Sequence, residues 1–255
     1  MLKIRIIPTM LYKDFGLVKG VNFDSWRRTG SAMQTVKIYN MRQVDELIFL
    51  DISATLNNRQ PDYELIDDLA DECFMPFTVG GGITKVSHIQ RLLEVGADKI
   101  SINTAAVLNP ALITEAAKNF GSQCIVVSID YRINTDGKAI IFTHSGTQPI
   151  KLDLITWVKR VEELGAGEII LTSIDRDGTM KGYDINVTKT VCNAVNIPVI
   201  ASGGAKDYED MYEILRQTNI SAVAAASIFH FTEKTPLEAK KYLHKVGIPT
   251  RIPTL

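Results

Sequence analysis

Short runs of apolar, β-branched residues recur along the chain at regular intervals. Near-continuous runs of this kind are typical of strands that are buried on both faces, as in parallel sheets. They cover residues 4–10, 46–52, 77–80, 99–103, 124–130, 168–174, 199–202 and 222–226. The pattern therefore predicts eight buried strands.

Amphipathic segments separate most of these runs. In the clearest of them, Asn109 and Pro110 precede residues 111–120, and Gly121 follows. This order gives an N-cap, a proline at the first helical position and a glycine that ends the helix. Further helices are predicted at residues 153–164, 186–195 and 206–217.

The alternation of strands and helices runs through the chain without a linker-like stretch. Such alternation favours one α/β domain with a parallel sheet. A complete (β/α)₈ barrel needs roughly 250 residues, and the chain has 255. We therefore predict a single (β/α)₈ barrel, the TIM-barrel architecture, over residues 1–255.

The chain also repeats itself. Three segments of the first half reappear in the second half at a shift of 122 or 123 residues. They are residues 46–51 with 168–173, 75–82 with 197–204 and, more loosely, 98–104 with 221–227. This period is too long for a solenoid, and it predicts two four-stranded half-barrels around a pseudo-twofold axis.

Composition and charge exclude several classes of function. The formal net charge is −1, so no sequence-wide basic field recruits nucleic acid or an anionic membrane. Three scattered cysteines suit a reducing compartment, and four histidines without ligand spacing give no metal site. The N-terminus is too short and interrupted for a signal peptide or membrane span. We expect a cytoplasmic protein without metal or cofactor.

Glycine clusters at residues 80–82 and 202–204 each follow an apolar strand. Glycine lets the backbone approach a ligand and turn its N–H groups toward an anion. A polar strand end follows one strand later, at Asn103 and Thr104 in one half and at Ala226 and Ser227 in the other. Tight strand-to-helix turns would explain either cluster alone, but their repetition favours two matched phosphate cradles across one mouth.

Further polar residues follow the sixth predicted strand. Asp175, Asp177 and Gly178 lie in the sequence SIDRDGT. A turn at Asp177 and Gly178 would offer backbone N–H groups to phosphate. Thr172 and Ser173 either add hydroxyl contacts or pack the barrel rim.

Asp130 ends the fifth predicted strand, at the face where such barrels carry their active sites. It can act as a general acid or base if it faces the ligand, or it can cap the following loop. Superposing residues 6–11 on 125–130 places Leu11 in the position equivalent to Asp130. Two-carboxylate chemistry needs an ionisable group at both positions, and leucine supplies none.

Four charged residues stand at the start of otherwise apolar strands: Arg5, Glu46, Lys99 and Glu168. If they point inward, mutual pairing is required, because unpaired buried charges are very costly. The ring is then either a structural ion-pair layer or a gate for a small polar molecule. From the residues alone we favour the structural interpretation, since this face of a barrel usually serves stability.

The chain resembles the cyclase subunit of imidazole glycerol phosphate synthase (the HisF family) from residue 1 to 255. The motifs that carry this resemblance are long and in order. They are RIIP (5–8), FGLVKG (15–20), DELIFLDI (45–52), PFTVGGGI (76–83), GADKISINTAAV (96–107), FGSQ (120–123), SIDRDGT (173–179), ASGGA (201–205) and AASIFHF (225–231).

The resemblance implies a glutaminase subunit that docks beneath the barrel as a heterodimer partner and releases ammonia into it. It implies a gate at Arg5, Glu46, Lys99 and Glu168, and Lys19 on a mobile loop that closes over the substrate. Phosphate binding is implied for Gly82, Asn103 and Thr104 on one side, and for Asp177, Gly178, Gly204, Ala226 and Ser227 on the other. The family's two catalytic aspartates match positions 11 and 130.

Leu11 departs from the family at the catalytic position itself. The chain therefore resembles paralogues found with surface-polysaccharide gene clusters, which pair with a glutaminase and supply ammonia to a separate sugar amidotransferase. Our leading hypothesis is such an ammonia-channelling subunit. The alternative is a true cyclase in histidine biosynthesis, with Asp14 as the nearest substitute carboxylate. A third hypothesis is a non-enzymatic partner or activator of a glutaminase.

Overall fold

Eight parallel strands close into a barrel in the computed structural model, which describes residues 3–14 and 16–252. Each strand pairs with the next, and the last pairs with the first. In order they are β1 (Arg5–Lys13), β4 (Leu47–Asp51), β5 (Phe77–Gly80), β6 (Lys99–Ile102), β7 (Ile125–Ile133), β10 (Glu168–Ser173), β11 (Val199–Ser202) and β12 (Ala222–Ala225). The predicted TIM barrel and its eight strands are confirmed. Phe15 of the FGLVKG motif and residues 1, 2 and 253–255 of the predicted domain lie outside the described residues.

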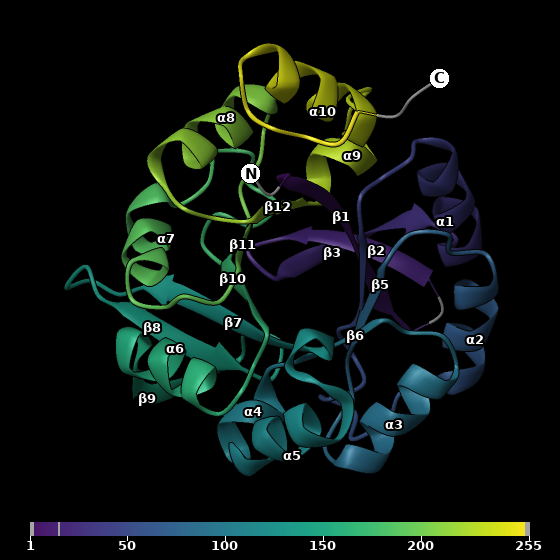
Figure 1. Ribbon diagram of the computed structural model, residues 1–255, viewed down its shortest axis with the longest axis vertical. Coiled ribbons are helices and arrows are strands. Elements are labelled where there is room, and N and C mark those ends of the chain that lie inside the picture. The colour runs from purple at the N-terminus through teal and green to yellow at the C-terminus, as the bar shows by residue number, and fades with distance from the viewer. Residues whose placement is uncertain (1–2, 15, 253–255) are drawn as a thin grey trace.

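Helices surround the ring of strands (Figure 1). They are α1 (Ala32–Met41), α2 (Tyr63–Asp71), α3 (Val86–Glu94), α4 (Thr104–Leu108), α5 (Ala111–Phe120), α6 (Leu154–Glu163), α7 (Ile185–Cys192), α8 (Tyr208–Gln217), α9 (Ser227–Phe231) and α10 (Pro236–Lys245), with a 3₁₀ turn η1 at Ser122–Cys124. Within the described ranges, no helix has the length and apolar character needed to cross a membrane.

The predicted helices are present with shifted ends. Pro110 precedes the first helical residue of α5 rather than occupying that position, although its backbone is already helical. Helix α7 ends at Cys192, three residues earlier than predicted. Helix α8 begins at Tyr208 rather than Lys206, because Asp207 caps it. These differences lie at helix ends, where side-chain caps rather than apolar periodicity set the boundary.

A capping box fixes the start of α8. The Asp207 carboxylate accepts from the backbone N–H of Asp210, whose own side chain accepts from the backbone N–H of Asp207. We expect Asp207→Ala to lower the free energy of unfolding by about 1 kcal/mol, the usual loss of an N-cap. Urea denaturation measures this, with Asp207→Asn as the control that keeps a cap acceptor. Equal losses in both variants would contradict the capping explanation.

Strand register confirms the alignment of the two half-barrels. In the first half β1 pairs Leu11 with Leu50 of β4, and in the second β7 pairs Asp130 with Thr172 of β10. Leu50 and Thr172 are themselves equivalent by the sequence repeat. Leu11 therefore occupies the structural position that Asp130 occupies in the other half.

Each half-barrel also carries a hairpin that the sequence patterns did not predict. Strands β2 (Gly16–Val21) and β3 (Asp24–Gly30) follow β1, and β8 (Ala139–Thr143) and β9 (Gln148–Asp153) follow β7. The first strand of each hairpin pairs antiparallel with the barrel strand before it. Strands β2 and β3 lie across the centre of the ring in Figure 1. The repeat therefore includes the hairpins.

Apolar side chains fill the barrel at mid-height. This inner cluster is separate from the larger core between the strands and the helices. Its buried members are Ile7, Ile48, Val126, Ile170, Ile200, Ala222 and Ala224. Charged residues lie below this layer and polar residues above it, so the barrel has an apolar middle between two polar ends.

Candidate active site and barrel floor

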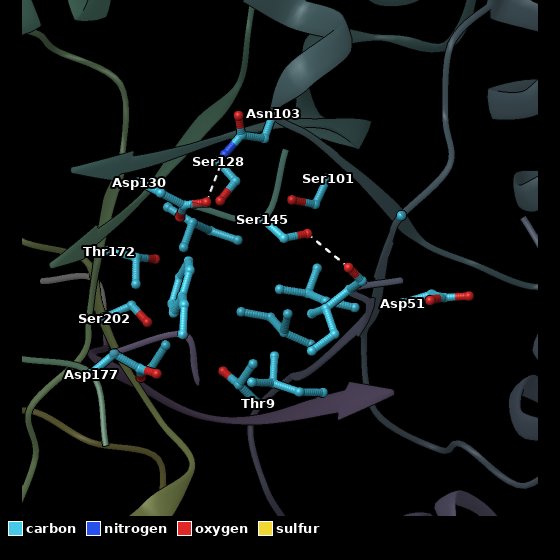
Figure 2. A pocket seen from close by; sticks show the side chains of 18 of the residues that line it. Thr9, Asp51, Ser101, Asn103, Ser128, Asp130, Ser145, Thr172, Asp177 and Ser202 are labelled. Carbon is cyan, nitrogen blue, oxygen red and sulfur yellow. Dashed lines mark hydrogen bonds between the residues drawn. The ribbon is translucent and has the colours of Figure 1, made fainter. Parts of the chain in front are cut away.

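A cavity of about 190 Å³ opens at the carboxyl ends of the strands. Figure 2 shows its labelled polar residues: Asp130, Thr172, Ser202 and Asp177 follow one another along one side, Thr9 lies below, and Asp51 lies on the opposite side. Residues of both half-barrels line it, including Gly81 and Gly82 of one glycine cluster and residues 202–204 of the other. Most of the sequence-predicted residues of the mouth are therefore brought together in one place, whereas Ser173 and Asp175 do not line the cavity.

Asp130 lies at the wall of this cavity and is 8% exposed. The Asn103 side-chain amide donates to its Oδ2 at 2.7 Å, as Figure 2 shows. Burial raises the pKa of Asp130 from 3.8 to about 7, and the Asp177 charge adds to the rise, while hydrogen bonds from Thr172, Asn103 and Ser128 oppose it. A carboxyl that titrates near neutral pH can both give and take a proton.

Leu11 faces the same cavity from β1 and is also 8% exposed. Leu50, its partner on β4, lines the cavity beside it. The carboxyl and hydroxyl of Asp130 and Thr172 are thus replaced by two isobutyl groups in the first half. Asp14 follows β1 with a left-handed backbone and is not among the residues that line the cavity, so it does not substitute for the missing carboxylate.

Large apolar side chains gather on the first-half side of the cavity. Those from the first half-barrel and its hairpin are Leu11, Phe23, Trp26, Ile48, Leu50, Ile52, Ile83, Ile102 and Leu108, whereas the second half contributes Ile170 and otherwise only alanines. Polar groups of the second half include Ser128, Thr172 and Ser202. The large apolar side chains of the mouth therefore come mainly from the first half, which also contributes polar residues such as Thr9, Ser101 and Asn103.

The second-half cradle has a backbone that only glycine can form. Gly178 and Gly204 both have positive φ, at 74° and 108°. A Cβ at Gly178 would lie 2.1 Å from the carbonyl oxygen of Gly20, and one at Gly204 equally close to that of Gly182. Ala226 and Ser227 complete this cradle, and the buried Ser227 hydroxyl has no hydrogen-bond partner among the described residues.

Three groups of the first-half cradle form hydrogen bonds within the protein. The backbone N–H of Gly82 donates to Thr55 Oγ1 at 3.4 Å. Thr104 Oγ1 accepts from the backbone N–H of His144 at 2.9 Å, and the Asn103 amide is directed to Asp130. The two cradles occupy equivalent positions in the two half-barrels, but they differ in how many of their polar groups form hydrogen bonds within the protein.

Lys19 lies in strand β2 rather than on a loop, which corrects the expectation from the resemblance. It is 2% exposed and forms an ion pair with Asp177. Asn22, at the tip of the same hairpin, donates its backbone N–H to the carbonyl of Asp177 at 2.8 Å and its side-chain amide to that of Asp175 at 3.0 Å. The first-half hairpin is therefore joined to the second half across the mouth.

Asp51 is a buried carboxylate at the mouth that the sequence analysis missed. It ends β4 and accepts from the backbone N–H groups of Ser53 and Ala54, both at 2.9 Å, and from Arg59 at 3.3 Å. These bonds hold the loop that brings Thr55 to Gly82. The signal was available, because Asp51 ends an apolar run just as Asp130 does.

The four charged residues of the barrel floor form a closed ring. Arg5 bonds to Glu46 at 2.7 Å and also pairs with Glu168, while Lys99 bonds to Glu46 at 3.0 Å and to Glu168 at 2.9 Å. Thr78 donates to Glu46 at 2.9 Å. Each charge has two opposite partners, so the predicted mutual pairing is confirmed. Pairing of this quality offsets the desolvation of all four groups.

Among the described residues, no group of three or more His, Cys, Asp or Glu side chains is placed so that it could hold a metal ion. The model of one family, described as histidine biosynthesis protein, matches residues 5–235. That range contains the residues of the mouth and of the floor named above.

Proposed function

Since the chain belongs to the histidine biosynthesis protein family, we propose that it is the barrel subunit of a glutamine-dependent amidotransferase. In this proposal a glutaminase docks at the floor as a heterodimer partner and releases ammonia, which passes through the barrel to the mouth. The observation that carries the proposal is the closed charged ring beneath an apolar barrel interior.

The apolar layer above the ring favours a small neutral molecule. An ammonium ion would lose its hydration among Ile7, Ile48 and Val126 with no carboxylate to replace it, and the cost of such a transfer is high. Neutral ammonia has no such charge to desolvate. Passage then requires the ring to open, and Lys99, a single flexible ammonium with a partly exposed side chain, is the member we expect to move.

Loss of cyclase chemistry is proposed from the mouth. Acid–base catalysis by two carboxylates fails when one is replaced by a side chain that cannot carry a proton, and each such group contributes about 10²–10⁴-fold. Leu11 is that replacement, and neither Leu50 nor Asp14 restores the function. We therefore propose that ammonia leaves the mouth for a separate sugar amidotransferase, with amidation of a surface-polysaccharide sugar as its use.

The cyclase of histidine biosynthesis remains the second candidate because of Asp130. Its buried carboxyl, with a pKa raised to about 7, has the proton affinity that a general acid or base needs at neutral pH. In this alternative the enzyme would form imidazole glycerol phosphate and aminoimidazole carboxamide ribonucleotide with one carboxylate of the pair.

Two assays on one preparation separate these candidates. The first measures glutamine hydrolysis by a candidate glutaminase subunit, with and without the barrel; we expect a stimulation of about tenfold or more, typical of coupling between linked sites. The second measures ammonia-dependent turnover of the histidine-pathway substrate, phosphoribulosyl formimino aminoimidazole carboxamide ribonucleotide, which we expect to stay at background.

An equal rate of glutamine hydrolysis with and without the barrel would contradict the proposed partnership. Efficient turnover of the histidine-pathway substrate would instead favour the cyclase, and Asp130→Asn should then abolish it. A variant of the exposed Asp67 on α2, Asp67→Asn, is the matched control, because it makes the same chemical change far from the mouth.

A further inference from the structure

The carboxyl of Asp130 differs from the other carboxyls of the mouth because it has no cationic partner. The two other acidic residues that line the cavity form ion pairs, Asp51 with Arg59 and Asp177 with Lys19. Within the described ranges, no lysine, arginine or histidine forms such a pair with Asp130, which is 8% exposed. A buried carboxylate without a counter-ion is costly, and a small cation that entered the cavity would lower this cost.

Hydroxyl groups surround the same cavity just above the apolar layer. Residues two apart on a strand face the same side of the sheet. In four barrel strands, a member of the inner apolar cluster is followed two positions later by a hydroxyl: Ile7 by Thr9, Val126 by Ser128, Ile170 by Thr172 and Ile200 by Ser202. Ser101 on β6 adds a fifth. Figure 2 shows these five side chains around the cavity, and we call Thr9, Ser101, Ser128, Thr172 and Ser202 the hydroxyl collar.

The hydroxyl collar has unused capacity to accept hydrogen bonds. A hydroxyl carries two lone pairs besides its one donor hydrogen. Ser128 and Thr172 donate to Asp130, which leaves their lone pairs available. The side chains of Thr9, Ser101 and Ser202 form no hydrogen bond within the described part of the chain. A set of carboxylate and hydroxyl oxygens suits a cation that donates hydrogen bonds in several directions.

Ammonium fits this set of oxygens better than a metal ion does. One carboxylate neutralises its single charge, and its N–H groups can donate to hydroxyl oxygens on several strands. The apolar layer beneath the hydroxyl collar favours passage of neutral ammonia, because it offers a cation no partner. Ammonia that leaves this layer therefore meets the hydroxyl collar and Asp130 as the first groups that can bind it and give it a proton.

We propose that Asp130 and the hydroxyl collar form an ammonium-binding site at the exit of the barrel. Neutral ammonia takes the proton of the Asp130 carboxyl: an N–H bond forms as the O–H bond breaks, and the resulting ammonium and carboxylate stay together as an ion pair. When the proton returns to the carboxylate, neutral ammonia leaves for its acceptor. The inference rests on the proposed function for the source of the ammonia, but its test involves no glutaminase.

Isothermal titration calorimetry of the full chain with ammonium chloride tests the proposal. Tetramethylammonium chloride, whose ion donates no N–H hydrogen bond, keeps the ionic strength constant. Potassium chloride and rubidium chloride are the comparison probes, because their ions are close to ammonium in size but donate no hydrogen bonds. We expect ammonium to bind about tenfold more tightly than either, the effect of hydrogen bonds to a charged group.

Matched variants locate the ion. Asp130→Asn removes the carboxylate and should weaken ammonium binding about tenfold or more, and Ser202→Ala should weaken it about threefold through loss of one acceptor. Ser145→Ala is the control, because this hydroxyl lines the same cavity but donates to the carbonyl of Ile52 at 2.7 Å. It should change the affinity less than about twofold. Thermal unfolding of each variant checks that the fold is retained.

The pH dependence separates binding at Asp130 from binding elsewhere in the mouth. The other charged groups that line the cavity are already paired, Asp177 with Lys19 and Asp51 with Arg59. Because burial raises the pKa of Asp130 to about 7, its carboxylate is about tenfold more populated at pH 8 than at pH 6. We expect ammonium to bind about tenfold more tightly at pH 8 and to release a proton on binding at pH 6. Asp130→Asn should lose both effects.

Three outcomes would overturn the inference. Equal binding of potassium and ammonium would show a site for any monovalent cation. Absence of ammonium binding would show that the mouth holds no such ion, and binding that is unchanged in Asp130→Asn would place the ion elsewhere. If the barrel still stimulates glutamine hydrolysis in any of these cases, the proposed function stands while this inference fails. Ammonium binding at Asp130 without stimulation would instead contradict the proposed partnership and leave this site in place.

Discussion

Asp130→Asn is expected to raise the free energy of unfolding at pH 8 by about 2–4 kcal/mol. Burial raises the pKa of this carboxyl from 3.8 to about 7 in the folded protein, and each unit of such a difference corresponds to about 1.4 kcal/mol. At pH 8 the folded protein therefore holds a carboxylate that is more costly than in the unfolded chain. Asparagine removes the charge and can still accept the bond from Asn103.

Because the pKa of Asp130 is raised in the folded protein, the stabilisation expected from Asp130→Asn depends on pH. Between about pH 4 and pH 7 the folded state binds more protons at Asp130 than the unfolded state does, so stability falls as pH rises through this window. Below it the carboxyl is protonated in both states and the effect disappears. Urea denaturation of wild type and Asp130→Asn at pH 5 and pH 8 measures the difference.

The gain should be large at pH 8 and small at pH 5. The exposed Asp67→Asn variant on α2 is the control, with a change within about 0.5 kcal/mol at both values. A gain of the same size at pH 5 and pH 8 would show that packing, not ionisation, causes it. Functional acids and bases often lower the stability of the folded protein. A gain on removal of the Asp130 charge would therefore support a functional role for this carboxyl.

Glu46→Gln is expected to lower the free energy of unfolding by about 3–5 kcal/mol, the usual result of removing one partner from a buried ion pair. The Glu46 side chain is 2% exposed, forms ion pairs with Arg5 and Lys99, and accepts a hydrogen bond from Thr78. Its neutralisation leaves two cations at the floor with Glu168 as their shared carboxylate. Urea denaturation at neutral pH measures the loss.

The double variant Glu46→Gln with Lys99→Met restores the charge balance. It leaves the pair between Arg5 and Glu168 and removes one cation together with one anion. We expect it to recover a substantial part of the stability, so the coupling energy of the cycle should exceed about 1 kcal/mol. Strictly additive losses would contradict an electrostatically coupled ring, and the floor would then be held by packing alone.

The barrel strands could be predicted from the sequence because each is a short apolar run that is buried on both faces. The hairpins could not. Strand β3 is mostly exposed, so no apolar run marks it. Its turn contains Asn22 and Phe23, both with positive φ, rather than the Asn-Gly pair that signals such a turn.

The residues of the candidate site could be predicted where their position along a strand determines whether they reach the mouth or the floor. The four floor residues stand at or directly before strand starts, and Asp130 ends its apolar run although β7 itself continues to Ile133. The repeat identified the Leu11 position, which the strand register bears out. The pair between Lys19 and Asp177 was not predictable, because it joins residues 158 positions apart through the unpredicted hairpin. The unequal hydrogen bonding of the two cradles likewise depends on Thr55 and His144, which no repeat marks.

The two hairpins also change how the barrel meets other copies of itself. A closed barrel has no free strand edge, but β3 and β9 each pair on one side only, so each offers unpaired backbone groups to a neighbouring chain. Arg27 and Arg28 lie in β3, and Pro149 and Lys151 in β9. Charge and proline are the usual means of blocking edge-to-edge aggregation. These residues of the two hairpins thus protect the protein from strand-by-strand self-assembly.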